Sequence, residues 1–317
     1  MISEKVKETL GKQHYAIAGK HSAIQVCRWT KKSLLDEGFC YKQKFYGIKS
    51  HRCCQMSPAV MWCQNRCLHC WRPIELTIGH ELKKENADNA KEIIKKCIEA
   101  QRKMLVGFKG NKKINPKKFE ESKEPMQFAI SLSGEPTIYP YIGKLIEELK
   151  KQGKTTFLVT NGLLPERLKE MQKNNQLPTQ LYLSVNAPTK ELFEKFTRPV
   201  IKNAWKKFNE TIVLFPKLKT RKVIRISLVR DLNMEDISGY AKIIEKAKPD
   251  FVEVKAFMSV GYARRRLAYE RMPLHPEIRE FAKKLSKSAK LKILDEKKES
   301  RVVLLGKSKK NLKIKQN

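Results

Sequence analysis

Short apolar runs recur along the chain from residue 58 onward, and stretches with helical periodicity separate them. Runs of this kind are typical of parallel strands that are buried on both faces. Strands are predicted at residues 58–62, 127–131, 155–159, 181–185, 223–229 and 251–257. Helices are predicted at residues 90–106, 142–151, 164–173, 190–196, 237–246 and 276–288. Strand and helix therefore alternate through most of the chain.

This alternation predicts an α/β fold, a partial (β/α)6 TIM-like barrel, in which functional side chains collect at the carboxyl ends of the strands. The first 55 residues show no comparable pattern. We expect one structural unit with three segments: an irregular N-terminal extension at 1–55, the barrel at 56–290 and a basic C-terminal segment at 291–317. The end of that last segment, residues 307–316, is expected to fray.

Three cysteines follow the first predicted strand with the spacing C-x3-C-x2-C, at Cys63, Cys67 and Cys70. Three thiolates on one loop can each bind one iron of a cubane 4Fe–4S cluster, which leaves the fourth iron open to a small molecule. A zinc site or three unrelated thiols are the alternatives. Zinc needs a fourth ligand, and His69 is too close to Cys70 to complete a tetrahedron comfortably. A cluster is therefore the favoured interpretation.

The cysteine loop resembles the signature of the radical S-adenosylmethionine (SAM) superfamily. In that superfamily an aromatic residue usually precedes the last cysteine, whereas here the position is His69, and Trp71 follows the cysteine. The resemblance implies a barrel of the radical SAM type, in which SAM chelates the open iron through its amino and carboxylate groups. It also implies that an electron from the cluster cleaves SAM to a 5'-deoxyadenosyl radical.

Candidate SAM contacts stand at the ends of three predicted strands. Ser133, Gly134 and Glu135 follow the second strand and resemble the Gly-Gly-Glu-like motif of radical SAM enzymes, which the resemblance assigns to the amino group of SAM. An ordinary Gly-Pro turn is the alternative when the motif stands alone. Polar side chains after the next two strands are candidates for the ribose or carboxylate of SAM, although turn chemistry explains them equally well: Asn161, Ser184 and Asn186.

Cys27, Cys40 and Cys53 stand thirteen residues apart in the N-terminal extension. Three further thiolates can hold a second cluster, but distant cysteines are often simply buried thiols, so the spacing alone leaves both interpretations open. All eight cysteines lie in the first third of a chain that is large enough to need no disulfides, which favours metal ligation in a reducing compartment.

The N-terminus does not resemble a signal peptide, and a cytoplasmic protein is expected.

The formal net charge is +34, from 67 Lys and Arg against 33 Asp and Glu, and basic residues are spread over the whole chain. Such a field attracts nucleic acid through counterion release, whatever the nucleic-acid sequence. The alternative is the charged surface of a heat-adapted protein. Heat adaptation adds charges of both signs, however, and so does not explain the excess of Lys and Arg over Asp and Glu. Arg264, Arg265 and Arg266 follow Tyr262 after the sixth predicted strand, where they suit phosphates and a stacked base.

Almost the whole chain resembles the archaeal tRNA 4-demethylwyosine synthases, radical SAM enzymes of wyosine biosynthesis. The resemblance rests on both cysteine triplets and on residues 107–110, 131–137, 184–188 and 253–273. It implies a carbon–carbon lyase that condenses N1-methylguanosine, next to the anticodon of tRNA(Phe), with pyruvate. It also implies a second 4Fe–4S cluster on the N-terminal triplet. An external electron donor, ferredoxin or flavodoxin, is expected as a transient partner, and a monomer is the default expectation.

Pyruvate needs an anchor, which is the open iron of the second cluster, a Schiff base with a lysine, or both. Lys42 and Lys49 lie among aromatic residues between the cysteines of the N-terminal triplet and are the first candidates, with Lys154 behind them. For any single lysine, a solvated or phosphate-facing charge is the alternative. Two other functions stay open: a different radical SAM enzyme that acts on RNA, and a non-catalytic iron–sulfur protein that binds RNA.

Overall fold

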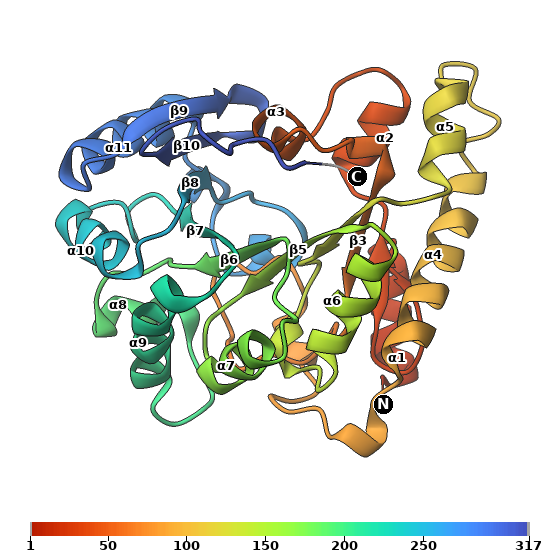
Figure 1. Cartoon of the computed structure of the whole chain (residues 1–317), viewed down its shortest axis with the longest axis horizontal. Helices are drawn as coiled ribbons and strands as arrows, with labels where there is room; N and C mark the ends of the chain where they lie inside the picture. The colour runs from red at the N-terminus through yellow and green to blue at the C-terminus, as the bar shows by residue number, and fades with distance from the viewer. Residues whose placement is uncertain (1, 316–317) are drawn as a thin grey trace.

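The computed structural model describes residues 2–315, which form one ten-stranded sheet with helices on its outer side (Figure 1). The central strands are parallel and adjacent in sequence order: β3 (Cys53–Ser57), β4 (Gln127–Ile130), β5 (Thr155–Thr160), β6 (Gln180–Ser184), β7 (Arg221–Leu228) and β8 (Phe251–Ala256). Antiparallel strands extend both edges: β1 (Ala16–Ile17) and β2 (Ala23–Gln25) beside β3, and β10 (Val302–Gly306) and β9 (Lys292–Lys297) beside β8. All three segments expected from the sequence thus contribute to one sheet.

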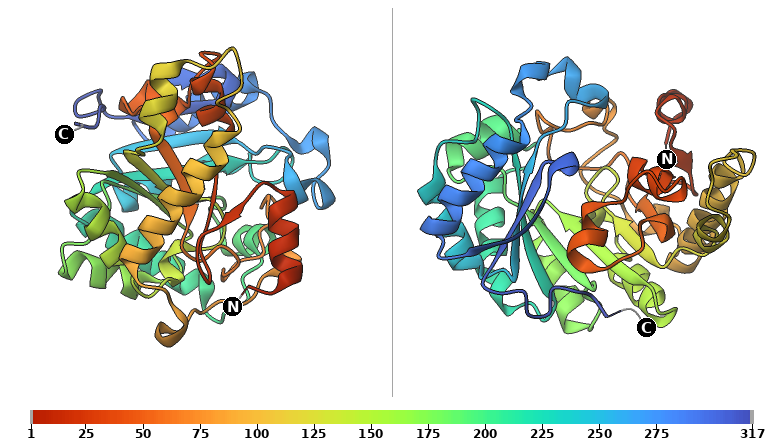
Figure 2. Two further views of the ribbon diagram at one scale, coloured as in Figure 1. Left: turned by 90° about the vertical axis from the view of Figure 1, so that its right-hand side faces the viewer. Right: turned by 90° about the horizontal axis from the view of Figure 1, so that it is seen from above.

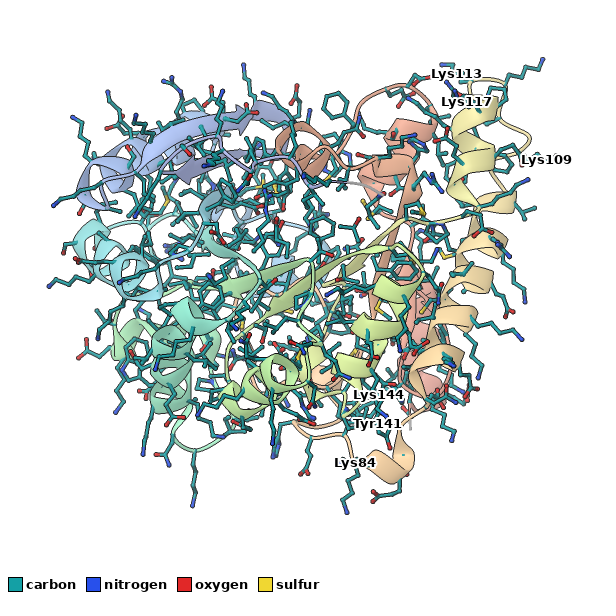
Figure 3. The ribbon with its side chains drawn as sticks, viewed as in Figure 1. Lys84, Lys109, Lys113, Lys117, Tyr141 and Lys144 are labelled. Carbon is teal, nitrogen blue, oxygen red and sulfur yellow. The ribbon has the colours of Figure 1, made fainter. Side chains whose placement is uncertain are left out.

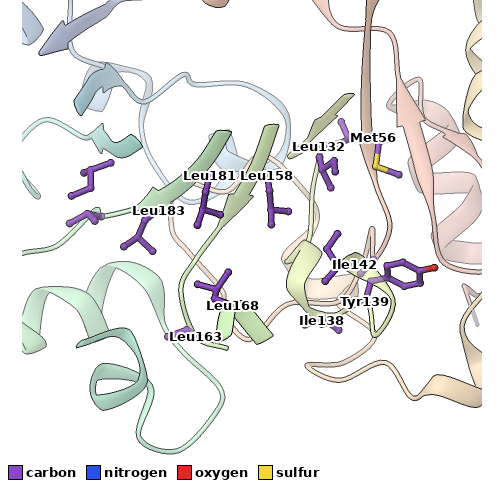
Figure 4. Packing of buried hydrophobic residues seen from close by; sticks show 14 of the residues in the cluster. Met56, Leu132, Ile138, Tyr139, Ile142, Leu158, Leu163, Leu168, Leu181 and Leu183 are labelled. Atoms are coloured by element: carbon purple, nitrogen blue, oxygen red, sulfur yellow. The ribbon is translucent and has the colours of Figure 1, made fainter. Parts of the chain in front are cut away.

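The helices of the predicted βα units begin and end within one residue of the expected positions. They are α4 (Ala90–Val106), α6 (Ile142–Lys151), α7 (Pro165–Lys173), α8 (Lys190–Thr197), α10 (Ile237–Ala247) and α11 (His275–Ser288). They surround the sheet from outside (Figure 2) and pack on apolar side chains of the strands, among them Leu158, Leu181 and Leu183 (Figure 4). The expected partial α/β barrel is confirmed.

The first parallel strand lies five residues earlier than predicted. Residues 58–62 form a turn, and β3 occupies Cys53–Ser57 instead. The run 58–62 is apolar because the turn itself is buried in the core. In β3, Cys54 and Met56 face the core, whereas Gln55 faces the opposite side and is half-exposed. A strand that is apolar on one face only gives no continuous apolar run, and so the pattern placed it wrongly.

The N-terminal extension is not irregular, so that prediction was wrong. Besides β1 and β2 it contains α1 (Glu4–Lys12), α2 (Arg28–Leu34) and α3 (Tyr41–Tyr46). Two further helices, α5 (Pro116–Ser122) and α9 (Ala204–Leu214), were not predicted either. Most of these elements are shorter than three turns, too short for an apolar period to stand out in a sequence. Short 3-10 helices lie at Ser50–Arg52, Ile74–Leu76, Lys84–Asn86, Pro136–Ile138, Phe215–Lys217, Gly261–Arg265, Tyr269–Arg271 and Lys298–Ser300.

The C-terminal segment is not frayed within the described residues, which contradicts the prediction for 307–315; residue 316 lies outside them. Leu312 is buried in an apolar cluster with side chains of α3 and the strands. The backbone N–H of Ile314 donates a hydrogen bond to the Tyr46 carbonyl (2.9 Å). Arg221 donates to the Leu312 carbonyl through Nη2 (2.6 Å). The segment is basic, but its apolar residues attach it to the barrel.

Much of the positive charge projects into solvent. Lys109, Lys113 and Lys117 gather at the connection from α4 to α5 (Figure 3), and all three are exposed. None of the helices within residues 2–315 is long and apolar enough to cross a membrane.

We expect Leu312→Ala to lower the free energy of unfolding by about 2 kcal/mol, because a buried leucine is truncated and leaves a cavity. Urea unfolding followed by circular dichroism measures the change. Lys315→Ala, three residues further along and exposed, is the control and should stay within about 0.5 kcal/mol of the parent. Equal stability of both variants would show that the segment is not anchored in solution.

Candidate active site

The inner face of the barrel is polar and partly open to solvent, whereas the outer face is apolar and closed. In β7, Arg225 and Ser227 on the inner side are half-exposed, while their neighbours Ile224 and Ile226 are fully buried. Lys255 in β8 repeats the pattern. Apolar side chains of α3 and of the strands fill the remaining part of the inner face. Functional chemistry on this barrel therefore belongs to the open, polar part of the inner face.

The loop with Cys63, Cys67 and Cys70 is held against several parts of the barrel. Trp71 Nε1 donates to the Leu132 carbonyl after β4 (3.1 Å), and the Leu68 N–H donates to the carbonyl of Phe196 in α8 (3.0 Å). Burial raises the pKa of the Cys63 and Cys67 thiols, and the neighbouring cysteine charges raise it further. The sulfurs are thus close enough to interact, and without a metal the Cys63 and Cys67 thiols resist ionisation.

This donor set fits a cluster better than a single ion. Within residues 2–315, no three His, Cys, Asp or Glu side chains converge at the spacing that one metal ion needs. In a cubane each thiolate binds a different iron, so the ligand sulfurs lie further apart than the ligands of zinc. His69 stacks on Phe196 (ring centroids 4.7 Å apart), and burial followed by the charge of Arg266 lowers its pKa to about 4. The imidazole therefore packs against α8 as a neutral ring.

The predicted SAM motif contacts the turn that leads into this loop. Gly134 has φ +73°, and a Cβ there would lie 2.0 Å from the Ala59 carbonyl oxygen, so only glycine fits. The Glu135 N–H donates to the Trp62 carbonyl (2.8 Å), and Ser133 Oγ donates to the Val60 carbonyl (3.1 Å). The end of β4 and the residues before Cys63 are therefore fixed to each other by backbone contacts.

The Glu135 carboxylate is buried and satisfied by the protein itself. It accepts from the Thr137 N–H and hydroxyl, from Thr160 Oγ1 (2.8 Å) and from the Asn161 N–H (2.7 Å). Burial raises its pKa, and the hydrogen bonds from Thr137, Asn161 and Thr160 oppose that shift. Glu135 thus links the ends of β4 and β5 where SAM was expected.

The other three predicted SAM residues occupy different environments. Asn161 Nδ2 lies 3.1 Å from Gln64 Oε1 and 3.9 Å from Cys63 Sγ, directly beside the cysteine loop. Ser184 is half-exposed on the inner face. Asn186 is buried, and its Oδ1 accepts from the Ser227 N–H (2.9 Å), which joins the end of β6 to β7. Asn186 therefore has a structural task as well.

The fold brings Cys27, Cys40 and Cys53 together on the inner side. Cys27 and Cys40 precede the first residues of α2 and α3, and Cys53 begins β3. Burial raises the pKa of Cys40 to about 11, and the charge of Cys27 adds to that effect. Ser50 connects the segments, because its Oγ accepts from the Cys40 N–H (2.9 Å) and its carbonyl accepts from Thr30 Oγ1 (3.1 Å). Three interacting thiols on three converging segments suit a second cluster.

Cys54 and Cys97 belong to the apolar core and not to this group. Both are fully buried in the main hydrophobic cluster on the outer face. Because successive residues of a strand face opposite sides, Cys53 and Cys54 are separated by the sheet.

The structure distinguishes the three candidate lysines. Lys42 is buried, and its Nζ lies 4.6 Å from the Phe157 ring centroid and 5.0 Å from that of Tyr182. Burial lowers the pKa of Lys42, and Arg225 lowers it further. Lys49 is exposed, with Nζ 3.4 Å from a carboxylate oxygen of Glu121. Lys154 precedes β5 and donates to the Pro125 carbonyl (2.9 Å).

A buried charged network beneath Lys42 escaped the sequence interpretation. The Glu253 carboxylate, fully buried in β8, accepts from Tyr41 (3.1 Å) and Tyr46 (2.6 Å) of α3 and from Arg225 Nε (3.0 Å). Nearby, burial and Arg225 lower the pKa of Lys255 to about 8. The sequence did carry a signal for this network, because charged residues interrupt two of the apolar runs that predict strands.

The three consecutive arginines do not act alike, contrary to expectation. Arg264 and Arg265 are exposed, and the Arg265 guanidinium lies 4.3 Å from the Tyr262 ring centroid. Arg266 turns inward and donates to the carbonyls of Leu68 and Cys70. The cysteine loop offers unsatisfied carbonyls at this point, and they bind the guanidinium in place of a phosphate.

One groove lies away from all of these residues. It has a volume of about 1060 Å³ between α10, α11 and residues 307–311, at the amino ends of β7 and β8. No candidate catalytic or ligating residue lines it within the described chain. The position of the candidate residues, and not the presence of this groove, therefore assigns the site to the inner face of the barrel.

The fold and the cysteine loop define a radical SAM protein. The family model of the radical SAM superfamily matches residues 58–244, and the model for wyosine base formation matches residues 246–307. The S-adenosyl-L-methionine-dependent tRNA 4-demethylwyosine synthase of Pyrococcus abyssi is 51% identical over 305 residues, 96% of this chain and 89% of that protein. The chain belongs to the tRNA 4-demethylwyosine synthase family, as its sequence suggested.

Two further comparisons agree. The protein of the same name from Methanocaldococcus jannaschii is 38% identical over 309 residues, 96% of each chain. A solved structure of TYW1 with a lysine–pyruvate adduct bound superposes with a TM-score of 0.87 at 36% identity, over 99% of this chain and 98% of that one. SAM and a 4Fe–4S cluster are the cofactors of the class.

We expect Gly134→Ala to lower the free energy of unfolding by more than 2 kcal/mol, because its Cβ would overlap a fixed carbonyl at a positive φ. Thermal unfolding of the cluster-free protein measures this. Gly107→Ala is the control, since Gly107 has helical φ and an added Cβ meets nothing within 4 Å. Similar melting temperatures for both variants would contradict the close contact.

Proposed function

We propose that this protein condenses N1-methylguanosine in tRNA(Phe) with pyruvate and forms 4-demethylwyosine. One observation carries the proposal: the SAM motif packs against the turn that leads into the cysteine loop, and the desolvated Lys42 lies beside Cys40 and Cys53 of the N-terminal triplet. The names of the relatives support it. A non-catalytic RNA-binding protein would not need a SAM motif packed against a cysteine loop.

Two groups of ligands follow from this proposal. Cys63, Cys67 and Cys70 hold the cluster that binds SAM, and the N-terminal triplet holds an auxiliary cluster. When bound and reduced, the SAM-binding cluster would supply the electron that cleaves SAM to methionine and a 5'-deoxyadenosyl radical, which can remove a hydrogen atom from the substrate methyl group. Ser133, Gly134 and Glu135 position the amino group of SAM, and Asn161, Ser184 and Asn186 lie where its other polar groups are expected.

Lys42 is the lysine we propose for pyruvate. Its amine has a lowered pKa, so a larger fraction is neutral and nucleophilic than for an ordinary lysine. Nζ attacks the pyruvate ketone carbon, the carbonyl oxygen leaves as water, and a protonated imine forms. In the solved TYW1 structure a lysine carries pyruvate. Lys49 is paired with Glu121 in solvent. Burial lowers the pKa of Lys154 too, but its amine lies over the ring of Phe128, in the core on the outer side of the sheet.

The other partners follow from charge and chemistry. The net charge of +34 suits the phosphate backbone of tRNA. A low-potential one-electron donor, ferredoxin or flavodoxin, supplies the electron. We propose a cytoplasmic monomer.

The function is tested by anaerobic incubation of the reconstituted, reduced protein with SAM, pyruvate and tRNA(Phe) methylated at that guanosine. Nucleoside mass spectrometry should reveal a tricyclic nucleoside that disappears when pyruvate is omitted. SAM cleavage without tRNA modification would point to another radical SAM substrate. Intact clusters without any SAM cleavage would favour the binding protein.

We expect Lys42→Ala to reduce pyruvate trapping by at least tenfold. Cyanoborohydride reduces the imine, and intact-protein mass spectrometry counts the adduct. Because the pKa of Lys42 is lowered, trapping in the parent protein should persist to a lower pH than an exposed lysine allows. Lys49→Ala and Lys154→Ala are matched controls and should trap like the parent. Undiminished trapping by Lys42→Ala would remove it from the catalytic set.

A further inference from the structure

Arg72, two residues after the last cysteine of the loop, is an unusually placed charge. Its side chain is only 1% exposed and is the largest among the fully buried ones in the described chain. Nη2 donates to the Asn65 carbonyl (3.3 Å). Nη1 is buried and has no hydrogen-bond partner within residues 2–315. The fold therefore holds a guanidinium away from water with much of its bonding capacity unused.

Carboxylates do not neutralise this charge. Among the ion pairs of residues 2–315, none involves Arg72. Glu75 pairs with Arg266 at 2.8 Å, and the Glu135 carboxylate is occupied by Thr137, Thr160 and Asn161. A buried charge without a partner costs several kcal/mol. Some other anion must compensate Arg72.

The cysteine sulfurs are the anions within reach. Arg72 stands two residues after Cys70, and it donates to the carbonyl of Asn65, whose own N–H donates to Cys63 Sγ (3.4 Å). The buried guanidinium is thus held beside the cysteine loop. A cluster on these thiolates carries net negative charge and provides the partner that the protein lacks.

We propose that Arg72 is the counter-ion of the SAM-binding cluster and raises its reduction potential. The inference rests on the assignment of Cys63, Cys67 and Cys70 as cluster ligands. Reduction adds one electron from a low-potential donor to the cluster and makes it more negative by one charge. A fixed positive charge in a dry environment favours that change. Arg72 acts on the cluster through its charge, and it needs no contact with the substrate.

The neighbouring arginines cannot take over this role. Arg66 is half-exposed and donates Nη1 to the Cys63 carbonyl (2.9 Å), so solvent screens its charge. Arg266 is paired with Glu75, which cancels most of its field at the cluster. Arg72 alone among these three is both buried and unpaired within the described residues.

The test compares Arg72→Met and Arg72→Lys with the parent and with Arg264→Met, which removes an exposed arginine as control. All carry alanine at Cys27, Cys40 and Cys53, so that only one cluster titrates. Electron paramagnetic resonance during a dithionite titration gives the midpoint potential. Arg72→Met should lower the equilibrium constant of reduction at least tenfold, which is 59 mV for one electron. Arg72→Lys should shift it by less than half of that, and Arg264→Met by nothing measurable.

An unchanged midpoint in Arg72→Met with full iron content would overturn the proposal. If that variant takes up no iron, the melting temperatures of the cluster-free proteins decide. Without a cluster the buried guanidinium is uncompensated, so cluster-free Arg72→Met should be at least as stable as the cluster-free parent. A less stable variant would mean that Arg72 only holds the loop together. Neither result depends on tRNA or pyruvate, so failure here and failure of the proposed function are distinguishable.

Discussion

The buried Glu253 carboxylate is the interaction on which the site depends most, because it joins two parts of the chain about 210 residues apart in sequence. It accepts hydrogen bonds from both tyrosines of α3 and from Arg225 of β7. Burial and hydrogen bonding together fix the position of α3 in the barrel. That helix begins directly after Cys40 and carries Lys42. The same network therefore positions Cys40 of the N-terminal triplet, the candidate pyruvate lysine Lys42 and Arg225, which lowers the pKa of that lysine.

The sequence was most informative where one face of an element is apolar and the element is long. The helices from α4 to α11 that belong to the βα units show a clear 3.6-residue period, and their bounds were predicted within one residue. β3 was misplaced because its inner face is polar and the turn after it is not. The elements of the first 55 residues are too short to carry a period. Residues 307–315 looked like a solvated basic tail, since five lysines outnumber the two apolar residues that anchor the segment, Leu312 and Ile314.

For the site, motifs predicted which residues meet, and geometry was needed to say what each one does. Both cysteine triplets and the SAM motif follow from spacing and from a family resemblance. The choice among Lys42, Lys49 and Lys154 does not, because it depends on burial and on Arg225, which is about 180 residues away in sequence. Arg72 follows Trp71 in the sequence without any sign that it will be dehydrated. An environment that is formed by residues far apart in the sequence leaves no pattern in the sequence around any one of them.

The contact between residues 311–315 and α3 has a consequence for the order in which the molecule is completed. Helix α3 forms from an early part of the chain, but β8, the last of the six parallel strands, and residues 311–315, which hold the helix in place, are translated much later. During synthesis the N-terminal cysteines must therefore wait, without their final surroundings, until the barrel has formed. Unprotected thiolates are open to oxidation in that interval. Assembly of the proposed auxiliary cluster is thus best timed after translation, when the barrel around the triplet has folded.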